Sequence, residues 1–153
     1  MKLAITQFFS VFFTSLALAP SLGHLLELPN KIGLSGADYF TVQQIYRGWA
    51  LLGIVVFGSL LATLALSVML RKHNRRKFAL ALSAFLCIAA TQVVFWLVTF
   101  PANQQTGNWT VMPANWMTLR MQWEYSHAAS AVLNLVALVA LMLCILAQNK
   151  RHQ

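Results

Sequence analysis

The sequence predicts an all-α membrane protein, a bundle of four transmembrane helices, and three observations support this. The 153 residues are 59% hydrophobic and 9% charged, whereas a soluble domain carries about 25% charged residues. Mean hydropathy is +0.65. The chain also contains four long apolar runs, each close to or above the roughly 20 residues that cross a bilayer as a helix. Because lipid offers no hydrogen bonds to the backbone, we expect each run to be helical.

One domain, residues 1–153, is expected to contain helices at about 3–26, 43–71, 77–100 and 114–148. The first run has features of a secretory signal peptide, since Lys2 precedes an apolar stretch that ends in Ala17–Leu18–Ala19. Pro20 follows directly after that site, where it disfavours cleavage. We therefore expect the first helix to be retained.

Basic residues predict the orientation of the bundle. Five Lys or Arg residues gather within Arg71–Lys77, and others flank the outer runs at Lys2 and Lys150–Arg151. Short loops rich in Lys and Arg stay in the cytoplasm, and these three places share one side only if the chain crosses four times. We expect both termini to be cytoplasmic, in a bacterial inner (plasma) membrane. The basic loop is interpreted as a topology signal, so no nucleic acid partner is expected, and the lipid bilayer is the expected surrounding.

Two of the three acidic residues lie three positions from a histidine. His24 and Glu27 close the first run, and Glu124 and His127 open the fourth. Side chains three residues apart share one face of a helix. At 1.5 Å per residue, both pairs lie about 30 Å from the cytoplasmic ends of their helices. We therefore expect the two pairs to meet near the outer membrane face.

Imidazole and carboxylate groups together suit iron, copper or zinc. His24, Glu27, Glu124 and His127 are therefore predicted to ligate one transition metal. A metal-free catalytic or binding pocket and a structural ion-pair network stay open as alternatives. In a catalytic site, Glu124 and His127 act on the substrate. Arg120 then either stabilises an anionic intermediate or holds Glu124 ionised.

Three further side chains are candidates for substrate binding: Asn103, Trp116 and Trp123. The two tryptophans could wall an aromatic pocket, or they could anchor the helix at the membrane interface. Asn103 could bond a substrate oxygen or cap the local structure. These assignments cannot be separated by spacing alone.

The string Pro101-x-Asn103, followed by Trp116-x-x-x-Arg120-x-x-Trp123-Glu124-x-x-His127, resembles the DUF1772 family of small four-helix membrane proteins. His24, Glu27 and Pro29 also fit that pattern, and the resemblance covers nearly the whole chain. The family includes anthrone oxygenases, which oxidise the activated methylene of a polycyclic aromatic to a quinone carbonyl. The resemblance therefore implies an oxygenase-like activity on an aromatic molecule.

The leading functional prediction is a membrane oxidoreductase or oxygenase that takes a lipophilic, aromatic small molecule at an outward-facing site. One alternative is a small proton-coupled carrier or exporter. Another is an accessory protein that binds haem or a metal through His24 and His127. Gly48, Gly53 and Gly58 leave a smooth helix surface on which a homo-oligomer could form.

Overall fold

The computed structural model describes residues 1–147, and within them the chain forms helices and turns but no strand. The long helices are α1 (Lys2–Lys31), α3 (Gly53–Leu70), α4 (Arg75–Val94) and α6 (Trp116–Leu146). Shorter elements connect them: α2 (Gly36–Gln43), η1 (Gln44–Tyr46) and η2 (Trp49–Leu52) before α3, and η3 (Phe95–Thr99) and α5 (Phe100–Gln105) after α4.

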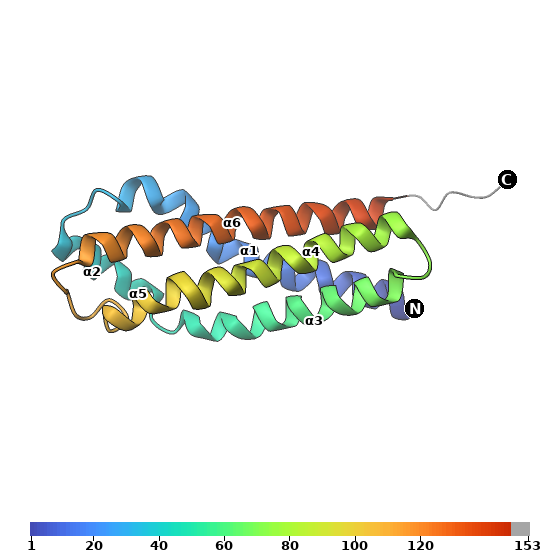
Figure 1. Ribbon diagram of the computed structural model, residues 1–153, viewed down its shortest axis with the longest axis horizontal. Helices are drawn as coiled ribbons and strands as arrows, with labels where there is room; N and C mark the ends of the chain where they lie inside the picture. The colour runs from blue at the N-terminus through green and yellow to red at the C-terminus, as the bar shows by residue number, and fades with distance from the viewer. Residues whose placement is uncertain (148–153) are drawn as a thin grey trace.

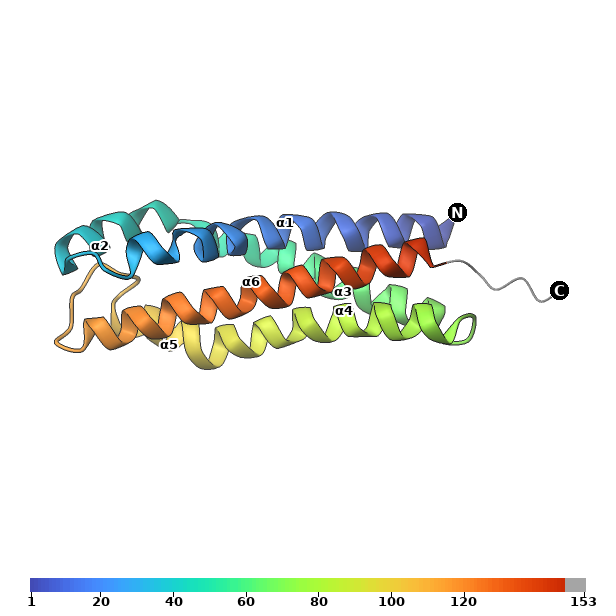
Figure 2. The ribbon, with the colours of Figure 1, turned by 90° about the horizontal axis from the view of Figure 1, so that it is seen from above.

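The long helices run side by side as an elongated rod (Figures 1 and 2). α1 packs against α3 and α6, and α4 packs against the same two helices, so the four follow one another around the bundle axis. The N-terminal end of α1, the α3–α4 turn and the C-terminal end of α6 share one end of the rod (Figure 1). The connections that carry α2 and α5 lie at the opposite end.

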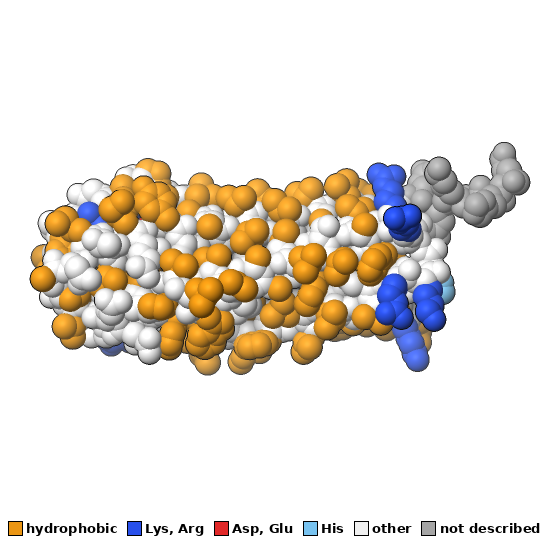
Figure 3. Space-filling view, viewed as in Figure 1, with side chains coloured by type: hydrophobic (Ala, Val, Ile, Leu, Met, Phe, Trp, Pro, Cys, Tyr) orange, Lys and Arg blue, Asp and Glu red, His pale blue; other side chains and the backbone are white. Residues whose placement is uncertain are grey.

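The outside of the rod matches an apolar solvent. Four helical segments within residues 1–147 are long and apolar enough to cross a membrane: Lys2–Lys31, Trp49–Leu70, Arg75–Gln105 and Trp116–Leu146. Hydrophobic side chains cover the length of the rod, and Lys and Arg side chains gather at the end that holds the α3–α4 turn (Figure 3). The prediction of an all-helical membrane protein with four spans is confirmed at this level. Gln148 and the basic residues Lys150 and Arg151 lie outside the described part of the chain.

The interior of the bundle is built from small and hydroxyl-bearing side chains. Thr14 Oγ1 on α1 lies 2.7 Å from Ser59 Oγ on α3, and Asn134 on α6 donates to Ser21 Oγ on α1 across 3.1 Å. Most buried alanines lie on α4 and α6, where they let the backbones approach closely: Ala81, Ala84, Ala131, Ala137 and Ala140. Such packing is typical of membrane helices. Because lipid tails are as apolar as the side chains, burying apolar surface between helices stabilises their association little, and close packing of small residues contributes more.

The glycine surface expected on the second span is interrupted in the structure. A Cβ on Gly58 would meet the Phe13 ring of α1 at 2.9 Å, so this glycine serves contact within the chain. Gly48 lies before α3 with φ of 88°, a left-handed conformation that favours glycine. Formation of a homo-oligomer stays a prediction.

The second predicted helix, residues 43–71, is wrong in its first third. Gly48, in a left-handed conformation, interrupts the helix there. Two short 3₁₀ turns, Gln44–Tyr46 and Trp49–Leu52, precede the α-helix that begins at Gly53. The first helix, expected over 3–26, instead continues to Lys31, with Pro29 inside the helix. This extension places Lys31, at the end of α1, among the buried residues.

The third predicted helix, 77–100, begins two residues earlier and extends further. Asn74 caps its start by accepting from the Lys77 backbone N–H at 3.0 Å. Before Pro101 the helix widens into the π-turn η3, in which the Phe100 N–H bonds the Phe95 carbonyl. A proline crowds the preceding turn and donates no hydrogen bond, which accounts for the change in pitch. The fourth helix, expected over 114–148, begins at Trp116 and ends at Leu146.

Candidate functional site

The two histidine–glutamate pairs meet, as their spacing predicts. His24 and Glu27 lie on the last turns of α1, and Glu124 and His127 lie on α6 at the same depth. The imidazole rings of His24 and His127 are in contact, with ring centroids 4.2 Å apart and planes inclined by 33°. His24 is 5% exposed. The expectation that these two distant segments share one place in the bundle is confirmed.

A lysine that the sequence interpretation missed sits between the two carboxylates. Lys31 Nζ lies 3.2 Å from Glu27 Oε2 and 3.2 Å from Glu124 Oε1, and it donates to the Tyr46 hydroxyl at 2.7 Å. An ammonium group has three N–H donors, so these three acceptors match them. The spacing of four residues between Glu27 and Lys31 is a signal that could have found this contact, had α1 been extended past residue 26.

Two tyrosines from the α1–α3 connection complete this arrangement. Tyr39 on α2, fully buried, donates to Glu124 Oε1 at 2.9 Å and accepts from Gln43. Tyr46 on η1 donates to Glu27 Oε2. We call Glu27, Lys31, Tyr39, Tyr46 and Glu124 the polar cluster. The α1–α3 connection therefore supplies two of the five residues of the polar cluster, and α1 and α6 supply the other three.

Both tyrosine hydroxyls of the cluster hold their protons. Burial, followed by the charge of Glu124, raises the pKa of Tyr39 far above its ordinary value. Burial and the hydrogen bond to Glu27 raise the pKa of Tyr46 in the same direction. At neutral pH each hydroxyl therefore donates to its carboxylate.

Arg120 was predicted to act on the substrate or on Glu124, but its side chain is directed toward the segment before α2. Its Nη1 donates to the Leu34 carbonyl at 2.7 Å, and its guanidinium lies over the rings of Trp116 and Tyr39, at 4.8 and 5.4 Å from their centroids. Among residues 1–147, Glu124 forms its ion pair with Lys31 instead. In this structure, Arg120 ties the start of α6 to the segment that leads into α2.

The three predicted substrate-binding side chains separate into different surroundings. Trp123 contacts both histidines, with centroids 4.2 Å from His127 and 5.0 Å from His24. Trp116 stacks with Arg120 rather than with the histidines. Asn103 accepts from Trp109 Nε1 at 3.1 Å. Trp109 in turn packs on Trp123, so Asn103 reaches the site through another residue.

Several buried polar atoms around the histidines have no hydrogen-bond partner among residues 1–147. Those in this part of the bundle are His24 Nδ1, Gln43 Oε1, Arg120 Nε, Trp123 Nε1 and Glu124 Oε2. Buried polar groups of folded proteins are nearly always paired. Three of these atoms belong to residues in contact with the histidines or with Lys31, so unpaired polar atoms gather in this part of the bundle.

The four predicted metal ligands do not fit a single ion in this arrangement. Within residues 1–147, no three His, Cys, Asp or Glu side chains are grouped to hold a metal. The Lys31 ammonium already lies between the two carboxylates and would oppose a second cation there. The direct contact of the two imidazoles also leaves no space for a haem between them. The transition metal stays a prediction, and no chemistry is assigned to it below.

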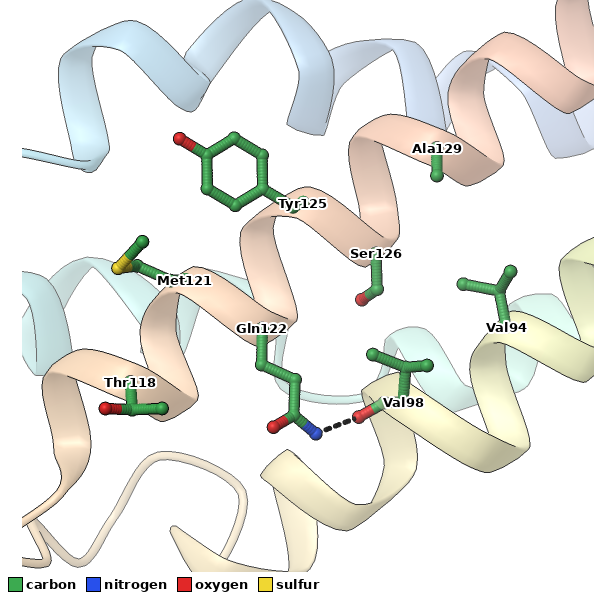
Figure 4. Close-up of a pocket in the computed structure, with 8 residues that line it drawn as sticks. All are labelled: Val94, Val98, Thr118, Met121, Gln122, Tyr125, Ser126 and Ala129. Carbon is green, nitrogen blue, oxygen red and sulfur yellow. Dashed lines mark hydrogen bonds between the residues drawn. The ribbon is translucent and has the colours of Figure 1, made fainter.

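A shallow apolar groove lies on another face of α6, against α4 and η3 (Figure 4). Its lining residues are Val94, Val98, Thr118, Met121, Gln122, Tyr125, Ser126 and Ala129. Gln122 reaches across it to donate to the Val98 carbonyl at 2.7 Å (Figure 4). This bond satisfies a backbone group in the irregular stretch before Pro101. None of the predicted site residues lines the groove.

The chain was compared with protein-family models, with curated proteins and with solved structures, and no match was found in any of the three. The resemblance to the DUF1772 family therefore stays a prediction that depends on the residues quoted for it.

Proposed function

We propose that this protein is a membrane enzyme of the oxygenase type, which acts on a lipophilic aromatic molecule. The observation that carries the proposal is the contact of two imidazoles beside a buried ammonium group. His24 Nδ1 is buried and has no hydrogen-bond partner in residues 1–147, so it can accept a proton. Trp123, Tyr46 and Trp49 surround the His24 ring with aromatic surface.

The chemistry begins with removal of a proton from an activated methylene by His24. Negative charge then develops on the substrate. Trp123 Nε1, a buried donor with no partner in the described residues, and the nearby Lys31 charge stabilise it. The carbanion adds to O2, and protonation gives a hydroperoxide. Loss of water leaves a carbonyl, so that CH2 and O2 become C=O and H2O. Arg120, whose guanidinium donates to Leu34, is assigned a positioning role instead of direct anion stabilisation.

The proposed orientation follows the basic residues. With the α3–α4 turn in the cytoplasm of a bacterial cell, the polar cluster lies near the outer face of the inner membrane. A lipophilic substrate then reaches the site from the outer leaflet of the bilayer. Trp49, 39% exposed beside His24, offers aromatic surface along such a route.

The test uses purified protein in nanodiscs with anthrone, a tricyclic ketone whose central methylene is acidic. Oxygen uptake and anthraquinone absorbance are followed together, and both should rise above the rate of empty nanodiscs. A positioned base contributes about 10²-fold or more, so His24→Asn should lower kcat by about that factor. His73→Asn is the matched control, because His73 is exposed in the α3–α4 turn. Equal rates for wild type, His24→Asn and empty nanodiscs would refute the proposal.

A proton-coupled carrier is the second candidate, and one observation favours it. Glu124 is fully buried within a membrane-spanning segment, yet it pairs with Lys31 instead of being replaced by an apolar residue. Intramembrane carboxylates of this kind often exchange protons during transport. Uptake of a lipophilic cation or weak base into proteoliposomes that depends on a pH gradient, and is lost in Glu124→Gln, would support the carrier over the enzyme.

A further inference from the structure

The end of the rod that holds the α3–α4 turn carries positive charge without a counter-charge (Figure 3). Five of the seven residues 71–77 are basic, and we call them the basic turn: Arg71, Lys72, Arg75, Arg76 and Lys77. The three acidic side chains of the chain lie toward the opposite end of the rod, on the last turns of α1, on α2 and in the first half of α6: Glu27, Asp38 and Glu124. Both ion pairs within residues 1–147 involve Lys31, so the basic turn has no carboxylate partner there.

Hydrogen bonds hold the backbone of the basic turn in a defined shape. The Leu70 carbonyl accepts from the N–H groups of His73 and Asn74, at 3.1 and 3.2 Å. Asn74 Oδ1 in turn accepts from the Lys77 N–H at 3.0 Å. Four of the five basic residues are exposed: Arg71, Lys72, Arg75 and Arg76. The turn therefore presents its positive charges outward from a fixed backbone.

The two adjoining helices affect these charges in opposite ways. Arg71 and Lys72 follow the C-terminal end of α3, where the helix dipole attracts cations. Arg75, Arg76 and Lys77 instead form the first turn of α4, which contains no acidic residue, and the dipole repels cations at this end. A topology signal depends on the number of Lys and Arg residues in a loop and gives no reason for this position. An anion from outside the chain would offset the repulsion.

An apolar surface begins directly beside the basic turn. Val68, three residues before Arg71 on α3, is exposed, and so is Leu86 on α4. Ala79, one helical turn after Arg75, is exposed as well. Because α3 and α4 belong to candidate membrane spans, these side chains face lipid. A molecule that contacts both surfaces has a negatively charged group joined to hydrocarbon chains.

We propose that the basic turn binds the headgroup of an anionic phospholipid, whose acyl chains lie against α3 and α4. Clusters of four to eight Lys or Arg residues next to a membrane helix are typical of proteins that bind anionic lipids. Arg75 and Arg76 are suited to the phosphate, because a guanidinium group can donate two parallel N–H bonds to its oxygens. This lipid site is independent of the proposed enzyme activity, whose residues lie toward the other end of the rod.

Native mass spectrometry of the full-length protein in a non-ionic detergent measures this binding, since it counts lipid adducts at increasing lipid concentration. The probes are phosphatidylglycerol and phosphatidylcholine with the same acyl chains, so that the two lipids differ only in their headgroups. We expect the first phosphatidylglycerol to bind at least about tenfold more tightly than the first phosphatidylcholine. Added salt should reduce this preference, because exposed charges are screened.

Substitutions in the basic turn test the contribution of its charges. Each basic residue near an anionic surface contributes a factor of about five. Arg75→Gln should therefore weaken phosphatidylglycerol binding about fivefold, and Arg75→Gln with Arg76→Gln about 25-fold, while phosphatidylcholine binding stays the same. Arg47→Gln is the matched control, because it removes an exposed arginine from the α1–α3 connection, and it should leave both affinities unchanged. Arg75→Lys with Arg76→Lys keeps the charge and should keep most of the affinity.

Four results would overturn the lipid site. Equal affinity of the wild-type protein for the two lipids would show that the charges do not select the headgroup. Equal weakening in Arg47→Gln and Arg75→Gln would show an effect of net charge instead of this surface. A loss in the double lysine variant as large as in the double glutamine variant would assign the arginines a structural role. Displacement of phosphatidylglycerol by inorganic phosphate at a similar concentration would show that the turn binds a free anion.

Discussion

Replacing Lys31 tests whether the polar cluster holds the bundle together. Lys31→Met keeps an unbranched side chain, one atom shorter, and removes its charge, leaving the fully buried Glu124 carboxylate without a counter-charge. Removing one partner of a buried pair costs about 3–5 kcal/mol, so we expect a loss of that size in the free energy of unfolding. The contact of Lys31 with Glu27 adds little, because Glu27 is 42% exposed and an exposed pair contributes about 0–1 kcal/mol.

The assay is reversible unfolding of the purified protein in mixed micelles with increasing sodium dodecyl sulfate. Lys31→Met combined with Glu124→Gln should recover part of the loss, with a coupling energy of about 1–3 kcal/mol. Lys72→Met, an exposed lysine in the α3–α4 turn, serves as the matched control. If Lys31→Met unfolds within about 0.5 kcal/mol of the control, a typical surface substitution effect, the pair does not stabilise the fold as we infer.

Two further predictions follow from the same contacts. Tyr39→Phe leaves Gln43 and Glu124 each without a buried hydrogen bond and should destabilise the protein by about 1–3 kcal/mol; thermal unfolding in detergent measures this, and an effect no larger than that of Tyr125→Phe would contradict it. Because Lys31 lies between the carboxylates, protein purified without a histidine tag should contain no stoichiometric transition metal by elemental mass spectrometry. One metal per chain that disappears in His127→Asn would restore the metal site that the sequence predicts.

The spans and the meeting of the histidines could be predicted because each depends on a local property. Apolar length marks a membrane helix, and counting residues from the basic ends places His24 and His127 at one depth. The ring contact at 4.2 Å agrees with that count. These predictions used residue counts and the shared face of side chains three residues apart, and they required no tertiary contact.

The partners of the carboxylates could not be predicted in the same way. Spacing of four residues permits contact between Arg120 and Glu124, but the choice between Glu124 and the Leu34 carbonyl depends on how the α1–α3 connection folds back. Tyr39 and Tyr46 lie in that connection, where no periodic pattern indicates which residues turn inward. Lys31 lies beyond the first predicted helix, 3–26, so its contacts follow only from the extension of α1 to Lys31.

The connection between α1 and α3 lies outside the candidate membrane spans, yet it supplies two of the five residues of the polar cluster, Tyr39 and Tyr46. Insertion into a bilayer depends on the apolar lengths of the helices, and these are independent of residues 36–46. Substitutions in this short segment can therefore alter the polar cluster while the apolar lengths on which insertion depends stay the same. The apolar lengths of the spans and the two tyrosines of the polar cluster can thus be altered separately.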